Sequence, residues 1–186
     1  AWLVGDKRRR ITNLAILSLA TAINRTAPPL TVLTGGLVGL VLAPSPVWAT
    51  LPVAFVVVGM GVTSYPAAGI MRRVGRRRGF VLATLLSLIA SLGAAGSIIY
   101  ESFSGFCLAM VAIGANQAFV HQYRFAAAEN VPPSGVSHAV SLMLLSSLAS
   151  AWSGPELGHA GRDWIDGAPF AGAFVGMAGL SLLAVV

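Results

Sequence analysis

The strongest constraint on the fold is a cluster of five arginines between two long apolar runs. The five lie within the seven positions from Arg72 to Arg78, and the apolar runs cover 48–71 and 79–100. An arginine at the centre of a bilayer costs about 2.5–3.5 kcal/mol on insertion scales, so each run must leave the bilayer before the cluster. The pattern predicts two membrane-spanning helices joined by a short loop, which the positive-inside rule places on the cytoplasmic side.

The composition also indicates a membrane protein. The 186 residues are 56% hydrophobic and only 10% charged, whereas soluble domains average about 25% charged residues. We therefore expect an all-α membrane protein whose surroundings are the lipid bilayer. The net charge of +6 does not indicate a nucleic-acid partner, because the basic residues cluster beside apolar runs, where they set the orientation in the membrane.

The apolar regions predict six transmembrane helices in one bundle covering residues 1–186. The predicted spans are 11–42, 48–71, 79–100, 103–128, 136–157 and 169–186. With the amino end in the cytoplasm, ten of the 12 lysines and arginines lie on the inner side. These ten are Lys7, Arg8, Arg9, Arg10, Arg72, Arg73, Arg76, Arg77, Arg78 and Arg124. We therefore expect a multi-pass protein of the cell membrane with its amino end in the cytoplasm.

The arginine loop resembles the loop between the second and third helices of the major facilitator superfamily. That family pattern is roughly Gly-x-x-x-Asp-Arg-x-Gly-Arg-Arg, and two positions depart from it here. Ala68 stands at the first glycine and Arg72 at the aspartate. The matching positions are Arg73, Gly75, Arg76 and Arg77. The alternative is a cytoplasmic arginine hairpin of a kind that any polytopic protein can have.

A second resemblance lies in the fifth predicted span. Gly154, Pro155 and Gly158 are similar to the Gly-Pro-x-x-Gly end of a motif of exporters in the same superfamily. The alternative is a helix that ends at its proline. Together, the two motifs imply the amino-terminal six-helix half of a twelve-helix fold. The chain has no initial methionine and ends inside an apolar run, so we expect a carboxy-terminal half, or a partner subunit, outside it.

Arg25 is the first candidate for a solute site. It follows Ile11 by 14 residues, or about 21 Å of helix, which places it near the middle of the bilayer. Asn24 and Thr26 flank it, and the prolines at 28–29 predict a broken helix, a feature typical of transporter sites. Alternatively, 11–23 lies along the membrane surface and Arg25 sits among headgroups. The remaining stretch, 27–42, is short for a complete span.

The fourth predicted span carries a polar stripe. Gln117, His121 and Arg124 are spaced i, i+4, i+7, so they share one helix face that must avoid lipid. Arg124 alone could reach the inner headgroups, but Gln117 lies about 10 Å deeper. In the resembling family the first and fourth helices line the central cavity. The resemblance therefore implies a cavity lined by this stripe and by Asn24, Arg25 and Thr26.

These features favour secondary active transport of a small solute by alternating access, and the motif in the fifth span favours export. The resemblance implies that the arginine loop braces one state, with Glu129 as its carboxylate partner. The alternative is a six-helix scaffold or assembly partner that transports nothing. An enzyme is not expected, because no paired acids, Ser/His pair or metal ligands are placed at depth. The three histidines also lack metal-site spacing, so we expect no metal or cofactor.

Overall fold

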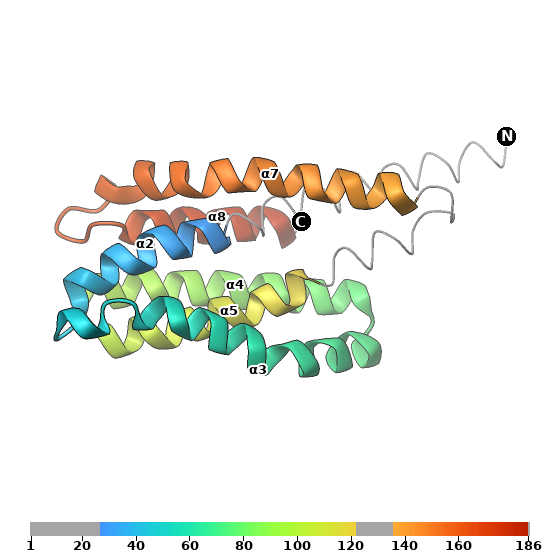
Figure 1. The fold of residues 1–186 in the computed structure, drawn as a ribbon, viewed down its shortest axis with the longest axis horizontal. Coiled ribbons are helices and arrows are strands. Elements are labelled where there is room, and N and C mark those ends of the chain that lie inside the picture. Colours follow the sequence, from blue (N-terminus) through green and yellow to red (C-terminus); the bar gives the residue numbers. More distant parts are fainter. Residues whose placement is uncertain (1–26, 122–135, 186) are drawn as a thin grey trace, which may run out of the picture.

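The computed structural model describes residues 27–121 and 136–185, and within these ranges the chain is helical without strands (Figure 1). The helices are α2 (Ala27–Leu42), η1 (Pro46–Trp48), α3 (Leu51–Val74), α4 (Arg76–Ile99), α5 (Phe103–Val120), α7 (Val136–Ala160), η3 (Gly161–Asp163) and α8 (Ala171–Val185). The all-α class expected from the sequence is confirmed for these residues.

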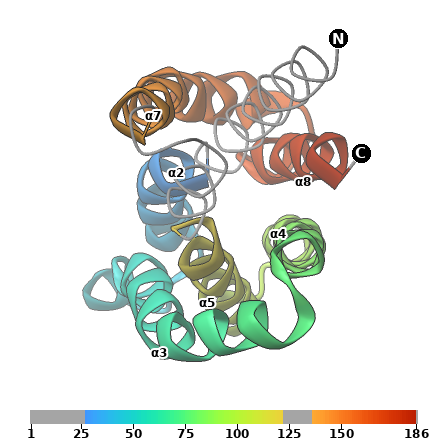
Figure 2. The ribbon, with the colours of Figure 1, turned by 90° about the vertical axis from the view of Figure 1, so that its right-hand side faces the viewer.

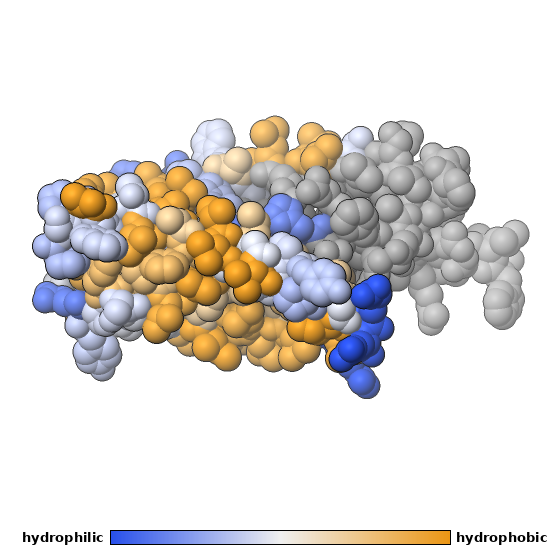
Figure 3. All heavy atoms as spheres, turned by 60° about the horizontal axis from the view of Figure 1, so that its bottom comes forward, coloured by the Kyte–Doolittle hydropathy of each residue, from blue (hydrophilic) through white to orange (hydrophobic). Residues whose placement is uncertain are grey.

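Within the described residues, three helical segments are long and apolar enough to cross a membrane. They are Pro46–Val74, Arg78–Ile99 and Phe103–Val120. Helices α2 and α8 are apolar but shorter, at 16 and 15 residues. Figure 3 shows a hydrophobic band on one face between more hydrophilic ends. Apolar side chains in lipid need no burial inside the protein, which fits exposures such as 61% for Val57 and 68% for Ile89.

The arginine cluster forms a tighter turn than the expected loop. Arg72 and Arg73 lie in the last turn of α3, and α4 begins at Arg76, so Gly75 is the single residue between the helices. Gly75 has φ 84°, a left-handed conformation that costs glycine nothing, and its N–H donates to the carbonyl of Met71 at 3.1 Å. One such residue is enough to reverse the chain, so the arginines belong to the helix ends.

Helix α5 lies between α3 and α4 in the bundle (Figure 2). Its closest approach to α3 is at Gly59 and Gly114, where a Cβ atom on either glycine would run into the backbone of the opposite helix. A Cβ on Gly59 would meet the carbonyl oxygen of Val111, and one on Gly114 would meet that of Val56. Small residues at a crossing let two membrane helices approach to backbone contact.

Helix α8 joins the bundle through α4 and α5. The hydroxyl of Ser181 in α8 donates to the hydroxyl of Ser87 in α4 at 3.0 Å, and both residues are buried. Phe174 packs edge-on against Phe106 of α5, with ring centroids 5.7 Å apart and an interplanar angle of 85°. The hydrogen bond and the edge-to-face pair fix how α8 lies against its neighbours.

Candidate functional site

Five of the residues predicted for the site lie outside the described ranges. They are Asn24, Arg25, Thr26, Arg124 and Glu129. The first-helix part of the cavity and the carboxylate partner of the arginine turn therefore stay predictions. The rest of the site is built from α5, α2 and α7.

Two adjacent amide side chains near the end of α5 are buried. Asn116 is 0% exposed and Gln117 is 8% exposed. Three of their amide atoms are buried and have no hydrogen-bond partner among the described residues: Oδ1 and Nδ2 of Asn116, and Nε2 of Gln117. Each such group costs about 1–3 kcal/mol, so a native structure that keeps three of them on two consecutive residues needs a reason.

Gln117 lies on the face of α5 that points toward α2. It shares this face with Ile113 and Met110, four and seven residues earlier. The side chain of Met110 lies close to Gly35 of α2, 3.6 Å from a Cβ built there. The two helices run in opposite directions (Figure 1), so a seven-residue step of about 10 Å brings Gln117 level with Pro28, at the start of α2.

Asn116 lies about 100° around the helix from Gln117 and points toward α4. It shares its face with Ala109, seven residues earlier, whose Cβ is 3.9 Å from a Cβ built on Gly93 of α4. Asn116 is not among the predicted site residues, because the predicted stripe follows the helix face of Gln117. A polar amide in an otherwise apolar span was the signal that could have identified it.

The buried threonines of α2 differ from these amides because their hydroxyls are used within their own helix. The hydroxyl of Thr31 donates to the carbonyl of Ala27 at 2.8 Å, and that of Thr34 donates to Leu30 at 2.7 Å. Both side chains are 0% exposed. Their donors are therefore satisfied, and the unmet hydrogen-bonding capacity in this region belongs to α5.

The predicted polar stripe passes from the interior to the surface. Helix α5 ends at Val120, and His121 lies in the turn that follows, where its side chain is exposed. Gln117, one helical turn earlier, is buried. The structure therefore gives the two residues different surroundings. Within the described ranges no cluster of three or more His, Cys, Asp or Glu side chains could hold a metal ion.

The glycine-proline motif sits inside α7 and faces α2. The helix continues through Pro155 to Ala160, so the alternative that the proline ends the helix is wrong. A Cβ on Gly154 would lie 3.0 Å from the backbone nitrogen of Leu30, and one on Gly158 would lie 3.1 Å from Cγ2 of Thr34. The two glycines are one turn apart and let α7 lie close to the first half of α2.

The arginine turn lies at the end of the molecule where α3 meets α4. Arg72 and Arg73 are exposed there, as is Arg78 in the first turn of α4. Arg76 is the first residue of α4, and Arg77 follows it. Positive side chains in the last turn of α3 interact favourably with its C-terminal dipole. Arg78, in the first turn of α4, has no such benefit, so orientation in the membrane or a partner is the role left for its charge.

One curated protein is similar to this chain over most of its length. The riboflavin transporter RfnT of Brucella anthropi is 38% identical over 173 residues, which cover 93% of this chain and 44% of the relative. The chain thus spans less than half the length of the curated relative it matches. No protein-family model matches the sequence, and no solved structure does.

Proposed function

We propose that this chain is part of a membrane transporter for a small, uncharged, polar solute, and that riboflavin is the first solute to test. The observation that carries the proposal is the pair Asn116 and Gln117, buried with three unpartnered amide atoms in a helix apolar enough to cross a membrane. An amide both donates and accepts hydrogen bonds, as do the ring edge and the hydroxylated side chain of riboflavin. The 38% identity to a riboflavin transporter supports the same choice.

The transport mechanism that we propose is alternating access by a six-helix unit of the major facilitator type. Helix α3 crosses α5 at Gly59 and Gly114, and α7 crosses α2 at Gly154. Helix α4 bonds to α8 through Ser87 and Ser181. These six helices form two triplets in chain order, α2–α3–α4 and α5–α7–α8. The second helix of each triplet thus meets the first helix of the other triplet, and the third helices meet each other. Such repeats are typical of transporters that rock around a central site.

The solute site that we propose extends from α5 to the first predicted span. Gln117 is level with the start of α2, and Asn24, Arg25 and Thr26 directly precede that helix in the chain. Arg25 would then find polar surroundings at depth, which an isolated arginine in lipid lacks. For Glu129, which follows α5 in the chain, we propose a pairing with an arginine of the α3–α4 turn in one of the two states.

Riboflavin binding tests the proposed solute directly. Titration of purified protein in dodecyl maltoside micelles should quench flavin fluorescence in a saturable manner, because a built site has a fixed capacity. Empty micelles are the control, since partitioning into detergent gives a signal that rises without saturation. A wild-type titration indistinguishable from that of empty micelles would reject riboflavin as the solute.

The proposed orientation predicts which positions an impermeant thiol reagent can reach in intact cells. The lone native cysteine, Cys107, is buried, so the labelling of each introduced cysteine can be compared with the background labelling of the wild type. Arg73→Cys, at the arginine turn, should stay unlabelled, and Asp166→Cys, in the segment before α8, should be labelled. Both native side chains are exposed, so access to water does not distinguish the positions. The opposite labelling pattern would invert the proposed topology.

A further inference from the structure

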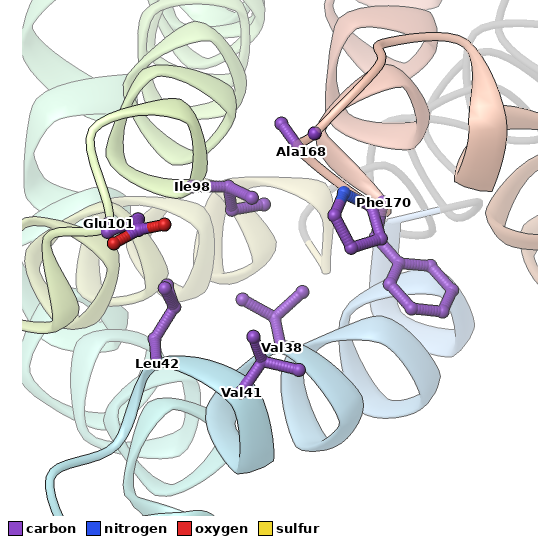
Figure 4. Close-up of a pocket in the computed structure, with 9 residues that line it drawn as sticks. Val38, Val41, Leu42, Ile98, Glu101, Ala168 and Phe170 are labelled. Atoms are coloured by element: carbon purple, nitrogen blue, oxygen red, sulfur yellow. The ribbon is translucent and has the colours of Figure 1, made fainter.

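The end of the bundle opposite the arginine turn holds a cavity of about 220 Å³ (Figure 4). It lies between the end of α2, the turn that follows α4 and the segment that leads into α8. Its volume is large enough for several waters or for a small organic molecule. The lining residues are Val38, Val41, Leu42, Ile98, Glu101, Gly167, Ala168, Pro169 and Phe170. The walls are thus apolar apart from the backbone and one acidic side chain, that of Glu101.

The backbone holds two of these lining side chains in an unusual conformation. Glu101 has φ 52° and Phe170 has φ 69°, and they are the non-glycine residues with positive φ in the described ranges. The left-handed region costs a non-glycine residue about 1–2 kcal/mol, and glycine would avoid this cost at either position. Both outliers line the same cavity, and backbone strain of this kind gathers at ligand sites.

The charge around the cavity favours a cation. The turn that contains Glu101 and the segment 161–170 carry three carboxylates and one arginine, Arg162. Arg162 is already engaged, with its Nε 3.8 Å from Asp163 and its guanidinium carbon 5.7 Å from the ring centroid of Phe170. Glu101 is the acidic residue that lines the cavity, and its side chain is exposed.

We propose that this cavity binds an organic ammonium group, with Glu101 as the counter-ion and the apolar walls around the carbon skeleton. A hydrated metal ion fits poorly, because calcium needs about six to eight oxygen ligands and the cavity offers one carboxylate. The ammonium could come from a free amine or from an ethanolamine lipid headgroup, since the chemistry is the same. This site lies far from Asn116 and Gln117 and does not depend on the proposed solute.

Binding of phenethylammonium to the protein in dodecyl maltoside micelles, followed by saturation-transfer NMR, tests the site. Glu101→Gln should weaken binding about fivefold, the ratio that corresponds to one exposed ion pair. Phenethyl alcohol, which lacks the charge, should bind wild type and variant alike. Asp166→Asn is the matched control, because Asp166 is an exposed carboxylate of the same end that does not line the cavity. Equal loss in both variants, or no loss in either, would overturn the proposal.

A second variant separates binding from folding. Glu101→Gly removes the carboxylate and suits the left-handed backbone, so it should keep or raise the thermal midpoint and still lose amine binding. Retained binding in this variant would also overturn the proposal. A competition experiment identifies the source of the ammonium. Dihexanoyl phosphatidylethanolamine is added to compete with phenethylammonium, and dihexanoyl phosphatidylglycerol, which has no ammonium group, is the control lipid. Competition by the first lipid alone assigns a headgroup, and competition by neither assigns a free amine.

Discussion

Replacing Gly59 by alanine should destabilise the bundle by about 1–3 kcal/mol or more, the range found when atoms are forced into a packed interior. The new Cβ would run into the carbonyl group of Val111 in α5. A backbone group of a packed helix cannot rotate away as a flexible side chain can, so the two helices must separate. Gly114→Ala should act in the same way from the other side, through the carbonyl group of Val56. Thermal unfolding in detergent, read by size-exclusion chromatography after heating, measures both effects.

Gly61 provides a matched control in the same helix. It lies two residues after Gly59, and a Cβ built on it has no neighbouring atom within 4 Å. Gly61→Ala should therefore leave the thermal midpoint unchanged or raise it slightly, because alanine is the better helix former. If the alanine variants at positions 59 and 61 unfold at the same temperature, the close crossing of α3 and α5 is wrong.

Apolar replacements of the two α5 amides should separate stability from function. Asn116→Leu and Gln117→Met keep roughly the same volume and remove the buried amide atoms that lack partners. Each variant should be as stable as the wild type or more stable, by up to about 1–3 kcal/mol, because that desolvation cost disappears. Riboflavin binding should fall about tenfold or more, since one lost hydrogen bond of about 1.4 kcal/mol has that effect.

Thr84→Val is the control for these two variants. Thr84 is 2% exposed, and its hydroxyl donates to the carbonyl of Phe80 at 2.9 Å within α4. Valine has nearly the shape of threonine, so the change removes only a buried hydroxyl. Unlike the amide atoms of α5, this hydroxyl has a hydrogen-bond partner within its own helix. It should leave riboflavin binding unchanged. Amide variants that lose stability and keep binding would show that the amides serve the packing of the bundle.

The features that depend on hydrophobicity and charge could be predicted from the sequence. The turn at Gly75 could be predicted, because five arginines cannot lie in lipid and a glycine stands between two apolar runs. The length of the turn, a single residue, could not be predicted, because the hydrophobic pattern does not fix the residue at which each helix ends. Arg72 and Arg73 therefore belong to α3, where a loop was expected.

The contacts between helices could not be predicted from the sequence. Gly59 and Gly61 look alike in the chain, yet they point in directions about 200° apart and only Gly59 meets another helix. Asn116 was not predicted for a similar reason. The stripe that contains Gln117 defines one face of α5, whereas Asn116 lies on another face and is buried because α4 packs there. A proline can end a helix, but α7 packs against α2 on both sides of Pro155 and continues to Ala160.

Riboflavin counterflow in reconstituted vesicles tests the central claim, that α5 binds a neutral solute which the protein carries across the membrane. Vesicles preloaded with unlabelled riboflavin need no coupling ion, so labelled riboflavin should accumulate transiently with the complete transporter that contains this chain, both as wild type and as Thr84→Val. The double variant Asn116→Leu, Gln117→Met should insert and fold but show no accumulation above empty vesicles. Full counterflow by the double variant, or none by the wild type, would contradict a riboflavin site built on these amides.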